Sequence, residues 1–302
     1  MIDPALLVGF AAASVRVGTP LGLAAIGEAI AEKSGVINLG VEGAMLAGAL
    51  GAAIGAMHGG VASGVVTAAA AGVIVATVFA AVAVGARADQ IISGTAVTLG
   101  ATGLTGLLAQ RLLTGPALSL PTLSSTPLPV INTIPFVGAV FFRQSVLTYA
   151  CYLLIPMASW LLWRTKFGLQ LRASGEAPMA AAAAGVGVAR MRTLAVLMGG
   201  FCAGLAGAAL VLAEVGTFTE RMTAGRGFIA IAIVALGRWN PWGVAAAALL
   251  FGAATALQYT FQAAGSHVPY QLFLALPYLL ALAALGAAIG RHRGPAALGQ
   301  PH

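Results

Sequence analysis

Long runs of apolar residues, separated by short polar stretches, dominate this chain of 302 residues. Most runs contain about 20 residues, the length of a helix that crosses the hydrocarbon core of a bilayer. The pattern predicts an all-α, polytopic helical membrane protein with about eight to ten transmembrane helices, including discontinuous segments. The predicted segments are approximately 5–27, 36–58, 61–85, 91–113, 145–163, 193–213, 226–237, 241–260 and 270–290.

Two of these segments are weaker than the others. The first is interrupted by Arg16, Gly18 and Pro20, although its lack of an N-terminal basic region indicates a retained segment rather than a cleaved signal peptide. The segment 226–237 is too short to span the bilayer alone. It either borrows residues from 214–225 or forms a half-helix beside a cavity.

The composition supports a membrane protein and excludes several soluble classes. Hydrophobic residues make up 60% of the chain and charged residues 8%, whereas soluble domains carry about 25% charged residues. These values argue against a soluble enzyme and a disordered chain, and the absence of a dense Lys/Arg run argues against a nucleic-acid partner. Cys151 and Cys202 lie inside apolar runs, so neither a disulfide nor a metal site is expected.

The distribution of basic residues predicts the orientation in the membrane. Four basic residues fall on the side assigned to the exterior, whereas ten fall in the loops assigned to the cytoplasm. The positive-inside rule then places the C-terminus in the cytoplasm and, with nine crossings, the N-terminus outside. The ten are Lys33, Arg87, Arg164, Lys166, Arg172, Arg190, Arg192, Arg238, Arg291 and Arg293.

Two loops are longer than simple connectors. Residues 114–144 contain five prolines, so we expect an external, mostly irregular cap or docking surface. Residues 164–192 are predicted to be cytoplasmic and mostly non-spanning. Within them, Pro178 suits the first turn of a helix and Gly185 its end, which predicts a surface helix of about two turns. Such a short helix must pack against its own bundle or against a cytoplasmic partner.

Glycines at small-xxx-small spacing allow helix backbones to approach closely. Gly51, Gly55 and Gly59 have this spacing, as do Gly200 and Gly204. The pattern fits close packing within one bundle, or a dedicated dimer face.

Polar residues cluster around the junction of the first two segments. Glu28, Glu32 and Lys33 fit a solvated turn at the membrane interface. Asn38 and Glu42, also four residues apart, fit either structural hydrogen bonding inside the bundle or contact with a polar permeant.

A third stretch, Gly225–Gly243, contains glycines at its entry and an Asn240-Pro241 turn before the next segment. Arg238, Trp239 and Trp242 fit an anchor at the aqueous interface.

Three stretches together resemble the permease subunits of bacterial ABC importers, and most closely the nucleoside-type simple-sugar permeases. They are Gly27–Met45 (GEAIAEKSGVINLGVEGAM), Gly168–Val186 (GLQLRASGEAPMAAAAAGV) and Gly225–Gly243 (GRGFIAIAIVALGRWNPWG). The chain departs from the family pattern at Lys33, where an arginine is common, and at Val186, where isoleucine is usual. The resemblance spans nearly the whole chain, and the order of the three stretches is specific.

The resemblance implies one permease domain, residues 1–302, in the bacterial inner membrane. The implied partners are cytoplasmic ATP-binding subunits, a second and often paralogous permease, and an external substrate-binding lipoprotein. By carry-over, residues 164–192 form the loop that couples to the ATPase. The coupling residues are Gly168, Arg172, Gly175, Glu176, Pro178 and Gly185.

For the solute, the resemblance favours nucleosides, followed by sugars and branched-chain amino acids, with Asn38 and Glu42 as candidate residues of the substrate path. The chain lacks the Gly-x-x-x-x-Gly-Lys-Ser/Thr loop that cradles phosphates. It is therefore expected to be a non-enzymatic transport subunit without a cofactor, and its partner would use the ATP.

Two other classes remain as alternatives. An ion-coupled secondary transporter would place acidic residues deep in the membrane, whereas most acids here map to segment ends and loops. An intramembrane enzyme would need a catalytic or metal cluster. The four histidines lie near segment ends or in the tail, and we expect no catalytic residue and no metal ligand.

Overall fold

The computed structural model describes residues 4–113, 120–127, 134–263 and 294–300, with scattered positions between 275 and 286. In this part of the chain, six stretches of helix are long and apolar enough to cross a membrane. The protein is therefore a polytopic helical membrane protein, as the hydrophobic pattern predicts. The predicted segment 270–290 lies mostly outside the described residues.

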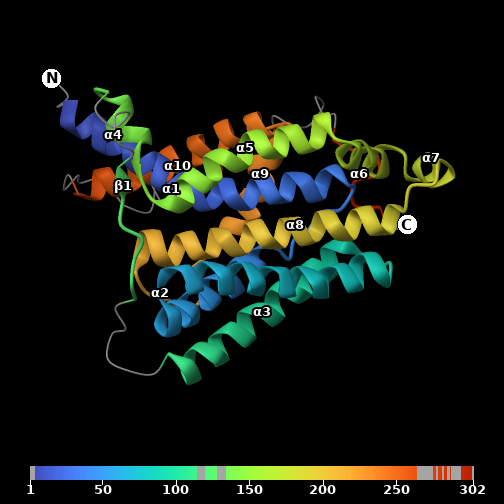
Figure 1. The fold of residues 1–302 in the computed structure, drawn as a ribbon, viewed down its shortest axis with the longest axis horizontal. Coiled ribbons are helices and arrows are strands. Elements are labelled where there is room, and N and C mark those ends of the chain that lie inside the picture. Colours follow the sequence, from blue (N-terminus) through green and yellow to red (C-terminus); the bar gives the residue numbers. More distant parts are fainter. Residues whose placement is uncertain are drawn as a thin grey trace.

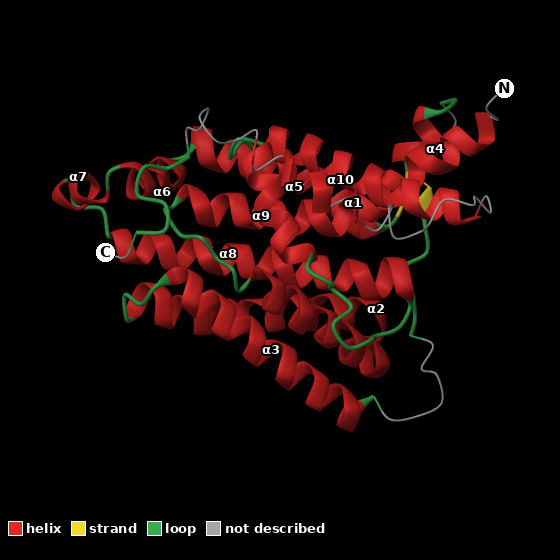
Figure 2. Ribbon diagram, turned by 180° about the vertical axis from the view of Figure 1, so that it is seen from behind, coloured by secondary structure: helices red, strands yellow, loops and turns green. Residues whose placement is uncertain are grey.

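Most of the described chain is helical, as Figures 1 and 2 show. The long elements are α1 (Pro4–Lys33), α2 (Val41–Ala80) with the π-helical turn η1 (Ala81–Gly85), α3 (Gln90–Leu112), α5 (Val146–Arg164), α8 (Val188–Ala208) with the π-helical turn η3 (Ala209–Val215), and α10 (Pro241–Ala263). The shorter helices are α4 (Val137–Phe141), α6 (Lys166–Glu176), α7 (Pro178–Ala183) and α9 (Arg226–Leu236). Two short strands, β1 (Thr126–Pro127) and β2 (Arg143–Gln144), pair antiparallel.

The expected interruption in the first segment is absent, because α1 runs through Pro20 without a break. Gly18 lies against α10, where an added Cβ would be 3.2 Å from the carbonyl oxygen of Ala248. The glycine therefore serves close packing of α1 on α10, and the helix continues because its neighbours hold it.

The element α2 consists of two antiparallel helices joined at Gly59 and Gly60. The chain reverses there, with a φ of 73° at Gly60 that favours glycine. Thr67 in the second half donates from its hydroxyl to the carbonyl of Gly51 in the first half at 2.7 Å. This hairpin confirms the two separate predicted segments, 36–58 and 61–85.

Helix α8 lies between α1 and the α2 hairpin, while α3 lies outside the hairpin and α5 and α10 lie beside α1 (Figures 1 and 2). A Cβ at Gly200 would clash with Gly72, and one at Gly204 would clash with the backbone of Ala68. Small residues thus let the central helices approach closely. In this chain, the small-xxx-small glycines pack within the bundle.

The loops gather at two ends of the bundle. At the end that carries α6 and α7, here called the α6–α7 end, Ile37 N–H donates to Gln90 and Ala297 N–H donates to the carbonyl of Gly175. The opposite end carries β1, β2 and the end of η3, where Leu120 N–H donates to the carbonyl of Gly216. The predicted grouping of the loops near residues 33, 87, 164–192 and 238 on one side is confirmed by this arrangement.

The loop 114–144 is largely irregular where it is described, as its prolines predict. It contains the five-residue helix α4 and the two strands. Leu123 N–H donates to the carbonyl of Leu212 at 2.7 Å, so the loop lies against the end of η3. It therefore covers the end of the bundle opposite α6 and α7.

Candidate functional site

Helix α6 is fixed to the end of α5 by its first two turns. The hydroxyl of Thr165 caps α6 by accepting from Gly168 N–H at 3.0 Å, and Gly168 itself has no room for a side chain against the carbonyl of Leu161. Arg172 donates from Nε to the carbonyl of Leu162 at 3.0 Å, and its guanidinium lies 4.3 Å from the ring centroid of Trp163. The sequence prediction included no helix here, although Thr165 was an available N-cap signal.

The last turn of α6 is bound to the connection between α1 and α2. Gly175 contacts the carbonyl of Lys33 so closely that no Cβ would fit. Glu176 is exposed and accepts from Ala296 N–H at 3.3 Å. The segment 294–300 continues along this end, where Gly299 N–H donates to the carbonyl of Gly35. The last turn of α6 is thereby packed against the segment that follows α1.

Helix α7 projects beyond the rest of the bundle (Figures 1 and 2). It begins at Pro178, which occupies the first helical turn, and its end is followed by Gly185 with a φ of 83°. The predicted short surface helix is therefore confirmed. Its side chain Met179 is 78% exposed, which leaves an apolar group available to another protein.

The six predicted coupling residues thus occupy two environments. Gly168, Arg172 and Gly175 hold α6 onto its own bundle. Glu176 and the α7 helix between Pro178 and Gly185 lie at the exposed tip, although the ring of Pro178 is itself buried.

The acidic residues at the end of α1 are buried, which corrects the expectation of a solvated turn. Glu28 is 0% exposed, and Glu32 is 2% exposed. Glu28 accepts from Asn38 N–H at 2.9 Å, and Glu32 accepts from the indole N–H of Trp239. Lys33 is also buried, with its ammonium 5.7 Å from the ring centroid of Trp163. The chain folds back over these groups, so distant segments replace water as their partners.

The two tryptophans that were expected to anchor the protein at the aqueous interface lie in different environments. Trp239 is 6% exposed and bonded to Glu32, so it is a buried contact between α9 and α1 and not an anchor. Trp242 is 59% exposed and keeps the geometry of an anchor.

The extended segment 36–38 leads from the end of α1 back into the bundle. Leu39 accepts from the hydroxyl of Thr98, which lies two turns inside α3. Asn38 is 1% exposed, and its side-chain oxygen has no hydrogen-bond partner among the described residues. The segment therefore brings an amide group into the interior at the point where α2 begins.

Glu42 binds the start of the half-helix α9. Its carboxylate accepts from the Thr223 hydroxyl at 2.6 Å, from Gly225 N–H at 2.8 Å and from Gly227 N–H at 2.6 Å. A carboxylate at a helix N-terminus satisfies unpaired amides and interacts favourably with the helix dipole. These bonds match the structural alternative for Glu42, and its contact with the solute stays a prediction.

A small cavity of about 140 Å³, here called the polar cavity because polar side chains interrupt its mostly apolar wall, lies beside the start of α9. Among its lining residues are Arg226, Thr255, Gln258, Tyr259 and Tyr278. Polar side chains from α9 and α10 meet here within an otherwise apolar bundle. The sequence prediction missed this set, although Thr255, Gln258 and Tyr259 interrupt an apolar segment and were available as a signal.

In the part of the chain that the structure describes, no three His, Cys, Asp or Glu residues lie close enough to hold a metal ion. Cys151 and Cys202 are both free and buried.

Comparison with known proteins places these features in a family. The model of the permease component of branched-chain amino acid transport systems matches residues 10–285. The guanosine ABC transporter permease NupQ of Bacillus subtilis is 35% identical over 96% of this chain and 95% of its own length. The nucleoside ABC transporter permease NupC of Lactococcus lactis is 32% identical over 93% of this chain and 92% of its own length.

A third relative carries a sugar name. A Haloferax volcanii protein, provisionally named a glucose ABC transporter permease, is 38% identical over 84% of this chain and 78% of its own length. No solved structure matches the chain with significance.

Proposed function

Because the chain belongs to the family of permease components of branched-chain amino acid transport systems, and is thus an ABC transporter permease, we propose that it carries nucleosides into the cell. Two relatives named for guanosine and nucleoside transport, matched over more than nine-tenths of the chain, support this solute. The relative named for glucose makes a sugar the second candidate.

The observation that carries the proposed mechanism is the continuous linkage between the exposed tip and the interior. Helix α7 projects from the bundle, while Gly175, at the base of the same loop, contacts Lys33 at the end of α1. A force applied to α7 would therefore reach the segment that ends at Asn38. We assign α7 and Glu176 to docking on a separate ATP-binding subunit, which would bind and hydrolyse the ATP.

The proposed orientation follows from charge. The α6–α7 end carries most of the basic loop residues, so we place it, with the C-terminus, in the cytoplasm of a bacterial inner membrane. An external substrate-binding protein would then deliver the solute to the opposite end. A second permease, either a copy or a paralogue, would complete the path.

We propose that the solute passes the polar cavity beside α9. Transporter sites form where broken helices expose polar groups in the interior of the membrane domain. The amide of Gln258 can hydrogen-bond a base or a sugar hydroxyl, and the ring of Tyr259 offers a face for stacking.

Competitive uptake in cells with and without the gene tests this function. We expect the deletion strain to lose ATP-dependent uptake of labelled uridine or adenosine, with excess nucleoside but not ribose, galactose or leucine competing in the parent. Lost uptake of a sugar or of leucine, with nucleoside uptake intact, would overturn the solute and keep the permease role. Uptake that survives ATP depletion but collapses with the proton gradient would contradict the ATPase-driven mechanism.

A further inference from the structure

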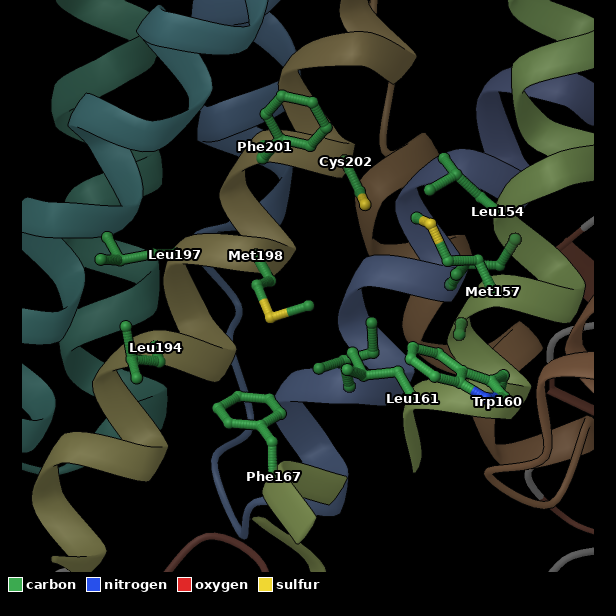
Figure 3. A pocket seen from close by; sticks show the side chains of 13 residues that line it. Leu154, Met157, Trp160, Leu161, Phe167, Leu194, Leu197, Met198, Phe201 and Cys202 are labelled. Carbon is green, nitrogen blue, oxygen red and sulfur yellow. The ribbon is translucent and has the colours of Figure 1, made fainter. Parts of the chain in front are cut away.

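An apolar groove with a volume of about 620 Å³ opens between α5 and α8, with α1 at its floor (Figure 3). Side chains from the three helices and from the first turn of α6 form its walls. They are Ile26, Ile30, Leu154, Met157, Ala158, Trp160, Leu161, Phe167, Leu194, Leu197, Met198, Phe201 and Cys202.

The chemistry of this groove does not suit a nucleoside or a sugar. Apart from the indole of Trp160 and the thiol of Cys202, its lining side chains carry no polar group. Sites for polar ligands place several hydrogen-bonding groups around the ligand. The groove is also open at its side, because Met157, Trp160 and Phe201 are 49%, 60% and 43% exposed. An occupant with a long hydrocarbon portion fits such a surface.

Three exposed basic residues lie within four positions of lining residues at the end of this groove that faces α6. Lys166 directly precedes the lining residue Phe167. Arg164 lies four residues after the lining residue Trp160, at the end of α5. Arg190 lies four residues before Leu194, so it is on the same face of α8, one turn nearer the α6–α7 end.

We propose that this groove binds an anionic phospholipid, with an acyl chain along the apolar walls and the headgroup phosphate at Arg164, Lys166 and Arg190. Along the helix axes, the apolar walls lie toward the middle of the bundle and the cationic residues lie at the α6–α7 end. The acyl chain and the headgroup of a phospholipid are arranged in the same order within a leaflet. Basic pockets between transmembrane helices recognise anionic headgroups, and long basic side chains reach the headgroup region. The proposal is independent of the solute that the permease carries.

Fluorescence quenching by brominated lipids tests the site in the full-length protein. The protein is reconstituted into nanodiscs of phosphatidylcholine that contain increasing fractions of acyl-brominated phosphatidylglycerol or, in parallel, acyl-brominated phosphatidylcholine. The signal of Trp160 is the difference between the native protein and the Trp160→Phe variant. We expect half-maximal quenching at a several-fold lower fraction of phosphatidylglycerol than of phosphatidylcholine. Equal quenching by both lipids would overturn the proposal.

Charge variants identify the headgroup contact. Lys166→Gln combined with Arg190→Gln removes two of the three headgroup cations and is expected to reduce the preference for phosphatidylglycerol several-fold. Arg87→Gln is the control, since Arg87 is an exposed cation in the turn between η1 and α3, and neither element contributes a residue to the groove. A preference that is unchanged in the double variant, or that Arg87→Gln reduces equally, would contradict the site.

A cross-linking measurement separates this proposal from a subunit interface. Met157→Cys is introduced at the exposed edge of the groove, and the assembled transporter is treated with a bifunctional thiol reagent, with the native chain as background. We expect no cross-link to the second permease. Efficient cross-linking, together with a Trp160 signal that neither brominated lipid quenches, would assign the groove to the partner subunit and overturn lipid binding.

Discussion

The carboxylate of Glu42 accepts a hydrogen bond from the amide of Gly227 at 2.6 Å, across 185 residues of chain. This bond joins the first turn of α2 to the first turn of α9, so two helices that begin inside the bundle share one carboxylate. Gly227 has no room for a side chain there, because an added Cβ would collide with the backbone of Glu42. These contacts give Glu42 the structural role that was one of its two expected alternatives, and its contact with the solute stays a prediction.

Replacing Glu42 by alanine is expected to destabilise the protein by about 2–4 kcal/mol, because the Thr223 hydroxyl, the buried amide of Gly227 and the part-buried amide of Gly225 lose their acceptor. Glu42→Gln keeps one carbonyl acceptor and should lose less. Thermal unfolding in detergent measures both, and Thr223→Ser, which keeps a hydroxyl, is the matched control. A Glu42→Ala variant as stable as the native protein would show that the cap contributes nothing.

Replacing Glu176 by arginine is expected to reduce substrate-stimulated ATPase activity of the assembled transporter by about tenfold, on the scale of one charged contact. The side chain is exposed, so the melting temperature should change little. Gln170→Arg, at another exposed position of α6, is the control. Unchanged stimulation in Glu176→Arg would remove this residue from the coupling contact.

Met179→Asp is expected to weaken co-purification of the ATP-binding subunit while the permease remains folded, because it places a charge on the exposed apolar side chain of α7. Leu169→Asp provides the comparison, since Leu169 is 60% exposed on α6. If Leu169→Asp alone released the subunit, the docking surface would lie on α6 and not on α7.

Truncation after residue 293 is expected to lower the melting temperature by several degrees. It removes the Ala297 bond to Gly175, the Gly299 bond to Gly35 and one carbonyl acceptor of the buried Arg192 guanidinium. Truncation after residue 300 keeps all three and should behave as the native protein. Equal melting temperatures for the two truncations would contradict a stabilising role of this segment.

Gln258→Leu is expected to raise the KM of nucleoside uptake by about tenfold, because one hydrogen bond to the solute is lost while the side chain keeps a similar size. Thr260→Val is the control, since Thr260 lies on the same helix and donates to the carbonyl of Ala256. If the KM of Gln258→Leu were unchanged, the cavity would be excluded from the solute path. The proposed function would still stand if the transporter kept its specificity for nucleosides.

The sequence predicted those parts of the fold that depend on local pattern. The two helices of the α2 hairpin correspond to the predicted segments 36–58 and 61–85, and α7 followed from Pro178 and Gly185. The half-helix α9 was one of two expected alternatives. In each case, the controlling residues lie within the segment itself.

The missed features depend on contacts between distant residues. Glu32 was assigned to water because its partner, Trp239, lies 207 residues away. The polar cavity joins α9, α10 and Tyr278, and no short motif marks that meeting. The hydrophobic pattern of a sequence indicates that a polar group in an apolar segment needs a hydrogen-bond partner. It does not identify the residue that provides this partner.

The two-glycine turn of α2 also bears on how the protein enters the bilayer during synthesis. The turn between the two helices carries no charged residue. It is also too short to form a hydrophilic loop that would have to be translocated across the membrane. The pair can therefore partition into the lipid as one unit. In the proposed orientation, Lys33 before the hairpin and Arg87 after it would both stay on the cytoplasmic side, so a single insertion event would set the orientation of both helices.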